Sequence, residues 1–162
     1  MGGLFGGLLG VEITKLLIGE THSSGDLFTL PIIVAIIIGR IGCFLAGTDE
    51  FTYGKVTASV LGMDLGDGMN RHPIALYEIV FLSLFFIVLR RIHNQSELPN
   101  GLQFKLFMIG YFGFRFFLEF IKPNEFFVAG LSTIQWLCVI CFVYYWKTLT
   151  TLPRAYKKIH LL

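Results

Sequence analysis

The sequence predicts an all-α, polytopic membrane protein with about five transmembrane helices and one longer extracytoplasmic loop. Of its 162 residues 54% are hydrophobic and 15% are charged, and the mean hydropathy is +0.69, which exceeds what a soluble core of this size needs. Apolar runs of about 18 residues or more, enough to span a bilayer, lie near 2–19, 27–47, 73–92, 101–122 and 130–150. Four of the ionisable residues within the second, third and fourth runs are Arg40, Glu78, Arg115 and Glu119.

The first run is rich in glycine, and this spacing predicts close helix packing; the residues are Gly3, Gly6, Gly7 and Gly10. Pro31 and Pro73 lie early in the second and third runs and suit helix starts. No internal repeat is evident, so residues 1–162 are expected to form a single transmembrane helical domain.

The long connection, 48–72, is expected to be a loop or short hairpin. Its acidic residues cannot be buried cheaply, which argues against a sixth span: Asp49, Glu50, Asp64 and Asp67. The stretch 64–68 predicts a tight turn, because it lacks the alternating oxygen ligands and closing glutamate of a calcium loop.

The cysteines and the net charge limit the classes of ligand and partner that the sequence favours. Cys43, Cys138 and Cys141 all lie in apolar stretches, which predicts helix packing rather than a disulfide or metal site. The net charge of +2 is too small to indicate nucleic acid, and the basic residues are dispersed among hydrophobic runs. Membrane lipid and lipid-borne substrates are therefore the expected partners.

The loop cations predict the orientation, because cytoplasmic flanks retain positive charge. One side carries Arg90, Arg91, Lys105, Lys147, Arg154, Lys157 and Lys158, and the other carries Lys55, Arg71 and Lys122. The first side is assigned to the cytoplasm, which makes 48–72 extracytoplasmic.

This orientation places the four ionisable residues at a similar depth, roughly 5 to 10 Å below the outer interface at the rise of an α-helix. Arg115 and Glu119 can meet on one helix face, and Glu78 can meet Arg40 between helices. Charge in hydrocarbon is costly, and a guanidinium fork suits a phosphate diester, so an anionic lipid site is predicted. The alternative is that two charge pairs simply hold three helices together.

Several motifs in order along the chain resemble the bacterial prolipoprotein diacylglyceryl transferase family. They are Gly39-Arg40-Ile41-Gly42, Tyr53-Gly54, Gly66-Asp67-Gly68, Arg71-His72-Pro73-Ile74-Ala75-Leu76-Tyr77-Glu78, Gly110-Tyr111, Phe114-Arg115 and Glu119. The glycine-led start resembles the family's His-Gly-Gly helix, and Gln135 resembles its late-helix glutamine.

The resemblance implies transfer of a diacylglyceryl group from phosphatidylglycerol to the lipobox cysteine thiol of a preprolipoprotein, at the outer face of the bacterial cytoplasmic (inner) membrane. It implies no cofactor or metal, and a nucleophile that the substrate supplies. Arg40 and Arg115 would bind the phosphate and stabilise the leaving group, with Glu119 and Glu78 orienting them. The other substrate-binding residues would be Tyr77 and Tyr111 at the head group, Arg71 and His72 at the lipid or peptide access side, and Gly47 and Gly54.

The chain departs from the family's pattern at several polar positions. Met1 stands where the family has His, Cys43 where it has Asn, Ala46-Gly47-Thr48 where it has Asn-Gly-Glu, and Ala75 where it has Gln. The family's two preceding helices have no counterpart in this sequence. Two interpretations stay open: an active transferase, or a non-catalytic phospholipid-binding or lipid-moving membrane protein built on the same helices. A small anion channel is disfavoured, because the two glutamates cancel much of the arginines' field.

Overall fold

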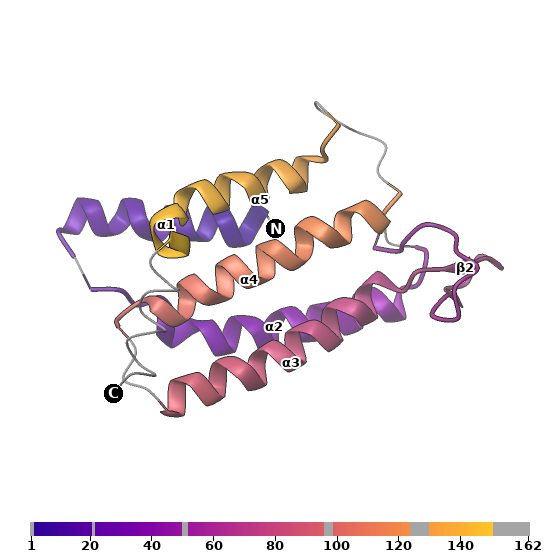
Figure 1. Cartoon of the computed structure of the whole chain (residues 1–162), viewed down its shortest axis with the longest axis horizontal. Coiled ribbons are helices and arrows are strands. Elements are labelled where there is room, and N and C mark those ends of the chain that lie inside the picture. Colours follow the sequence, from indigo (N-terminus) through magenta and orange to yellow (C-terminus); the bar gives the residue numbers. More distant parts are fainter. Residues whose placement is uncertain (1, 21, 50–51, 96–98, 124–129, 151–162) are drawn as a thin grey trace.

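The computed structural model is a helical assembly with one small hairpin (Figure 1). It describes residues 2–20, 22–49, 52–95, 99–123 and 130–150. The elements in order are α1 (Gly2–Ile18), α2 (Gly25–Leu45), β1 (Met63–Asp64), β2 (Asn70–Arg71), α3 (Ile74–Gln95), α4 (Leu102–Leu118), the 3₁₀ turn η1 (Glu119–Ile121) and α5 (Thr133–Tyr144). Met1, Glu50, Arg154, Lys157 and Lys158, on which parts of the sequence argument rest, lie outside the described residues.

The centre of the fold is the trio α2, α3 and α4, with α5 packed on α4 and α1 packed on α5 (Figure 1). Large apolar side chains fill the core between these helices, among them Ile33, Leu82, Leu89, Phe107, Met108 and Phe112. Gly110 lets α3 and α4 approach closely, because a Cβ there would lie 2.5 Å from the ring of Phe85. One turn away, the rings of Phe81 and Phe114 stack with centroids 4.0 Å apart.

Among the described helices, α2 is long and apolar enough on length and composition to cross a membrane. The helices in the other apolar runs do not meet this criterion of length and composition, for separate reasons. The helices α1 and α4 have 17 residues each and α5 has 12, since the predicted runs include residues that lie outside the regular helix. With 22 residues α3 is long enough, but it carries Glu78 near its start and Arg90 and Arg91 near its end.

Two of the expected local features are different in the structure. Pro31 lies inside α2 and not at its start, because the helix already begins at Gly25. The glycines of α1 do not make close helix contacts: a Cβ added at Gly3, Gly6, Gly7 or Gly10 would meet nothing within 4 Å. The space beside them is open, so the prediction of tight packing there was wrong.

Side chains cap the N-termini of two helices. Ser132 and Gln135 form a capping box at α5. The backbone N–H of Gln135 donates to Ser132 Oγ at 3.2 Å, and the backbone N–H of Ser132 donates to the side-chain oxygen Oε1 of Gln135 at 2.9 Å. Asp26 of α2 caps α4, because its two carboxylate oxygens accept the backbone N–H groups of Gly101 (2.6 Å) and Phe104 (2.8 Å).

The connection after α2 contains the antiparallel pair β1–β2, in which Met63 lies opposite Arg71. Its turn is tight because Asp64 Oδ1 accepts the N–H groups of Gly66 (2.8 Å) and Gly68 (3.0 Å). Two backbone hydrogen bonds hold this segment in place: the Gly54 N–H donates to the carbonyl of His72, two residues before α3, at 2.9 Å, and the Lys55 N–H donates to the carbonyl of Ile121 in η1 at 2.8 Å.

Gly47, where the chain leaves α2, provides a test of how the loop packs against the end of that helix. Its φ is +61°, and an added Cβ would collide with the carbonyl oxygen of Leu65. Gly68 has a similar φ of +74° but open space around it. We expect Gly68→Ala to lower the free energy of unfolding by about 1 kcal/mol, the cost of a left-handed residue, and Gly47→Ala to lower it by at least twice as much.

Thermal unfolding of the purified proteins in detergent measures the difference between the two variants. Equal destabilisation would mean that the approach of Leu65 to Gly47 does not hold the loop on α2.

Candidate functional site

Glu78 of α3 lies at the centre of a buried charge cluster. Its side chain is fully buried, and its two oxygens pair with arginines from two different helices. Oε2 forms an ion pair with Nε of Arg40 from α2, and Oε1 accepts from Nη1 of Arg115 from α4 at 2.6 Å. A single carboxylate therefore bridges the three central helices.

Two further residues of α4 and η1 complete the cluster. Glu119 Oε2 lies 3.7 Å from Arg115 Nη2, one helical turn away, and Tyr111 donates its hydroxyl to Glu78 Oε1 at 3.4 Å. Glu119 begins the 3₁₀ turn η1, so the helix tightens at this carboxylate. Both pairings expected from the sequence, Arg115 with Glu119 and Arg40 with Glu78, occur in the structure.

The two arginines differ in accessibility. The side chain of Arg115 is 2% exposed and that of Arg40 is 18% exposed. Within the part of the chain that the structure describes, Arg115 Nε has no hydrogen-bond partner, although it is buried. A buried unpaired donor costs free energy, and a phosphate oxygen is a strong acceptor for such a group. Arg40 Nη1 lies 3.8 Å from Cys43 Sγ, the thiol at one of the positions where the family pattern changes.

The other predicted site residues lie on the hairpin side of this cluster. His72 Nδ1 and the Tyr77 hydroxyl are 3.0 Å apart, so the two side chains hydrogen-bond each other. Arg71 donates from Nε to Asp67 at 2.6 Å, and its guanidinium carbon lies 4.8 Å from the ring centre of Tyr53. The hydrogen bond from Arg71 holds the pKa of the Asp67 carboxyl below its usual value.

The two predicted glycines contact the loop backbone. Gly47 lies against Leu65, as described above, and Gly54 lies against His72, where an added Cβ would come within 2.6 Å of the histidine Cβ. Gln135, which the sequence matched to a family glutamine, donates from Nε2 to the Phe116 carbonyl at 3.4 Å besides forming its cap. The pattern Ser132-x-x-Gln135 could have identified that capping role from the sequence.

Comparisons with known proteins identify the family. The sequence profile described as prolipoprotein diacylglyceryl transferase matches residues 1–150. This chain belongs to that family. Its members are membrane transferases, and curated relatives named phosphatidylglycerol–prolipoprotein diacylglyceryl transferase are similar to it.

Three of these relatives show the extent of the similarity. The Chlorobaculum tepidum protein is 34% identical over 148 residues, which cover 83% of this chain and 50% of the relative. The Bordetella parapertussis protein is 32% identical over 144 residues (83% and 55%), and the Ehrlichia ruminantium protein is 36% identical over 121 residues (71% and 45%). The chain spans about half the length of the curated relatives it matches. No solved structure matches it.

The charge cluster predicts that an isosteric substitution of Glu78 strongly lowers the stability of the protein. Glu78→Gln would leave the two arginines between α2, α3 and α4 without their shared counter-charge. Removing one partner of a buried ion pair typically costs about 3 kcal/mol or more, and we expect that loss of unfolding free energy here. Thermal unfolding in detergent is the measurement.

Glu20→Gln is the control, because Glu20 pairs with His22 at the surface, where both side chains are largely exposed. That variant should stay within about 0.5 kcal/mol of the parent protein. If the two variants unfold at the same temperature, the Glu78 carboxylate does not hold the arginines in place.

Proposed function

We propose that this chain carries the phosphate-binding site of a phosphatidylglycerol-dependent diacylglyceryl transferase, which modifies the lipobox cysteine thiol of preprolipoproteins. The observation that carries this proposal is the convergence of two guanidinium groups, from α2 and α4, on one buried carboxylate. Family membership supports the reaction class, and the relatives' names supply both substrates.

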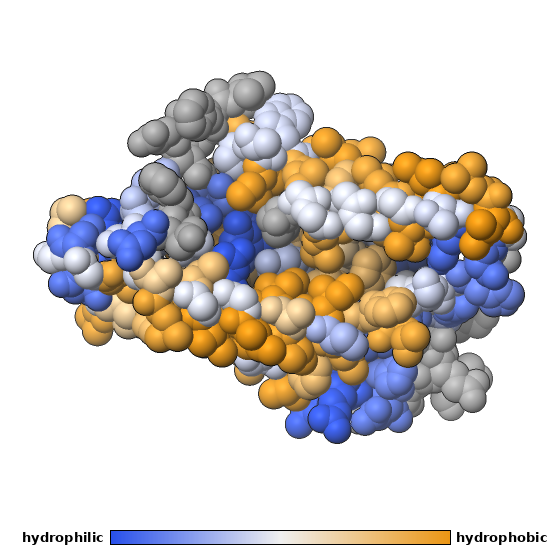
Figure 2. Space-filling view, turned by 180° about the vertical axis from the view of Figure 1, so that it is seen from behind, coloured by the Kyte–Doolittle hydropathy of each residue, from blue (hydrophilic) through white to orange (hydrophobic). Residues whose placement is uncertain are grey.

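The chain would form a single multi-pass domain in the bacterial inner membrane, with all five α-helices crossing the bilayer. Large apolar side chains on the helix surfaces support this, such as Leu16 (83% exposed), Leu45 (78%) and Phe117 (71%). Contact of so much apolar surface with water would be unfavourable, whereas lipid tails would cover it. Figure 2 shows apolar residues covering much of one face, with polar residues gathered toward the ends.

The site would open toward the outer face of the membrane. Arg90 and Arg91 lie near the end of α3 and Lys105 lies near the start of α4, and such positive flanks favour the cytoplasmic side. The hairpin lies at the other ends of these helices (Figure 1). The charge cluster lies at the same ends, because Glu78 is near the start of α3 and Arg115 is near the end of α4. The access side for the lipid and the lipobox peptide would then include Arg71, His72 and the two loop glycines.

In the reaction, the acceptor sulfur forms a bond to the diacylglyceryl carbon while the bond from that carbon to the phosphate oxygen breaks. The electron pair of the broken bond stays on glycerol phosphate, and the thiol proton is released. The phosphate group changes from a diester with a single negative charge to a monoester with about two charges near neutral pH. Fixed cations next to that oxygen stabilise the transition state more than the ground state.

Each cluster residue has a part in this step. Arg40 is the more accessible arginine and would contact the phosphate first, while Arg115 would supply the buried donor behind it. Glu78 and Glu119 would fix the planes of the two guanidinium groups through the ion pairs that they form. Tyr77 and Tyr111 would form hydrogen bonds with the lipid head group through their hydroxyl oxygens.

We expect Arg40→Lys to reduce turnover by at least about tenfold, because lysine keeps the charge but loses the planar fork that grips two phosphate oxygens. The measurement is mass gain on a synthetic lipobox peptide, with the full-length gene product in membranes that contain phosphatidylglycerol. Thermal unfolding of the same preparation checks that the fold is intact.

Arg90→Lys is the matched control, since Arg90 is exposed on the opposite flank, where positive charge alone is needed. Full activity of Arg40→Lys would remove the phosphate-binding role of that residue. If the parent protein itself transfers no lipid but still binds phosphatidylglycerol, the non-catalytic lipid-binding function replaces the transferase.

A further inference from the structure

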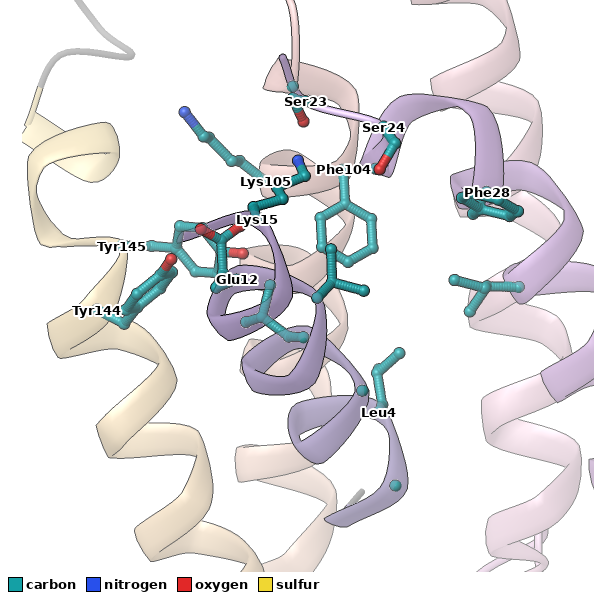
Figure 3. A pocket seen from close by; sticks show the side chains of 17 residues that line it. Leu4, Glu12, Lys15, Ser23, Ser24, Phe28, Phe104, Lys105, Tyr144 and Tyr145 are labelled. Atoms are coloured by element: carbon teal, nitrogen blue, oxygen red, sulfur yellow. The ribbon is translucent and has the colours of Figure 1, made fainter. Parts of the chain in front are cut away.

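A cavity lies far from the charge cluster. It has a volume of about 340 Å³ and lies where α1, the start of α2, the start of α4 and the end of α5 meet (Figure 3). Its lining includes Gly25 and Phe28 of α2, whereas Arg40 lies near the other end of the same helix. At the rise of an α-helix, Gly25 and Arg40 are about 22 Å apart, so the two sites are separate.

One face of α1 forms a wall of this cavity. The lining residues of α1 recur at spacings of three and four, as the residues on one side of a helix do: Gly3, Leu4, Gly7, Leu8, Val11, Glu12 and Lys15. Gly3 and Gly7 leave the space open, because a Cβ at either position would touch nothing within 4 Å. The glycines therefore form a groove along α1 instead of a helix contact.

The chemistry of the cavity changes along its length. Figure 3 shows the ends of Lys15 and Lys105 near Ser23 at one end, whereas Leu4 lies at the other end and the ring of Phe104 lies between them. The cavity thus has an apolar floor and a polar mouth. This is the pattern that an amphiphile with an apolar tail and a polar head would fit.

The mouth favours an anion. Two ammonium groups outweigh the single carboxylate of Glu12 among the lining residues. The Lys15 ammonium donates one hydrogen bond to the His22 carbonyl at 2.7 Å, and an ammonium has three donors, so it retains others for a ligand. The hydroxyls of Ser23 and Ser24 add neutral donors at the same end.

We propose that this groove binds an anionic phospholipid from the leaflet opposite the reaction site. One acyl chain lies along Gly3 and Gly7, and the phosphate lies between Lys15 and Lys105. This assignment rests on the membrane orientation given under the proposed function but not on the transfer chemistry. The bound lipid would connect α1 to α2 and α4, since α1 otherwise packs mainly on α5.

The test is a binding titration of the purified protein in a neutral detergent, followed by native mass spectrometry. The probes are dioleoylphosphatidic acid and dioleoylphosphatidylcholine, with inorganic phosphate as a competitor that has no acyl chain. We expect the parent protein to bind the acidic lipid at least tenfold more tightly than the neutral lipid. Millimolar phosphate should not displace it, because the acyl chain contributes to binding.

Gly7→Leu should fill the groove and weaken phosphatidic acid binding at least tenfold. Gly6→Leu is the matched control, because Gly6 also has open space around it but does not line the cavity. The Lys15→Gln, Lys105→Gln double variant should keep its binding of the neutral lipid and lose the preference for the acidic one. This second variant keeps the test valid if Gly7→Leu does not fold.

Three outcomes would overturn the proposal. They are equal binding by Gly7→Leu and Gly6→Leu, an unchanged acidic preference in the double lysine variant, and displacement by phosphate alone. Arg40→Lys separates this site from the reaction site, because Arg40 does not line the groove, and it should leave phosphatidic acid binding unchanged. A loss of binding in that variant would also overturn the proposal, since the measured lipid would then lie at the charge cluster and not in the groove. Because binding is measured without turnover, an inactive transferase would not affect the result.

Discussion

The structure depends on one carboxylate that two arginines share. Glu78 has no access to solvent, and each of its oxygens pairs with a guanidinium from a neighbouring helix. Burying any of these charges alone would cost several kcal/mol, so each of the three helices requires the other two. Because ion pairs of this kind tolerate little displacement, they fix the rotation and the height of α2, α3 and α4 relative to one another. The close approach at Gly110 and the stacked rings of Phe81 and Phe114 are consistent with that fixed arrangement.

The cluster could be predicted from the sequence because its ionisable residues stand out within apolar runs. Ionisable side chains are rare in long apolar runs, and their shared depth followed from the run boundaries and the helix rise. The sequence could not indicate that Glu78 contacts both arginines, since that depends on how three helices rotate against each other. Pairing Arg115 with Glu119 needs only the spacing of one helix, whereas pairing it with Glu78 needs the tertiary packing.

Other features differed in how far local sequence determines them. The cap formed by Ser132 and Gln135 is a local motif and was readable, but the cap that Asp26 supplies to α4 crosses 75 or more residues and was not. The glycines of α1 are the clearest error. Small residues permit close approach but do not cause it, and here the neighbouring helices stay away and leave a groove.

The attachment of the hairpin has a consequence for how this family can vary. Residues 54 and 55 connect the segment to His72 and to Ile121, the last residue of the turn that begins at Glu119. The Lys55 ammonium adds a hydrogen bond to the Phe120 carbonyl at 3.1 Å. Val60, farther along, is fully exposed. Insertions and deletions should therefore accumulate around residue 60, where the chain can change length without moving the helices. A length change next to residue 55 would shift the end of α4, so evolution should preserve the spacing there.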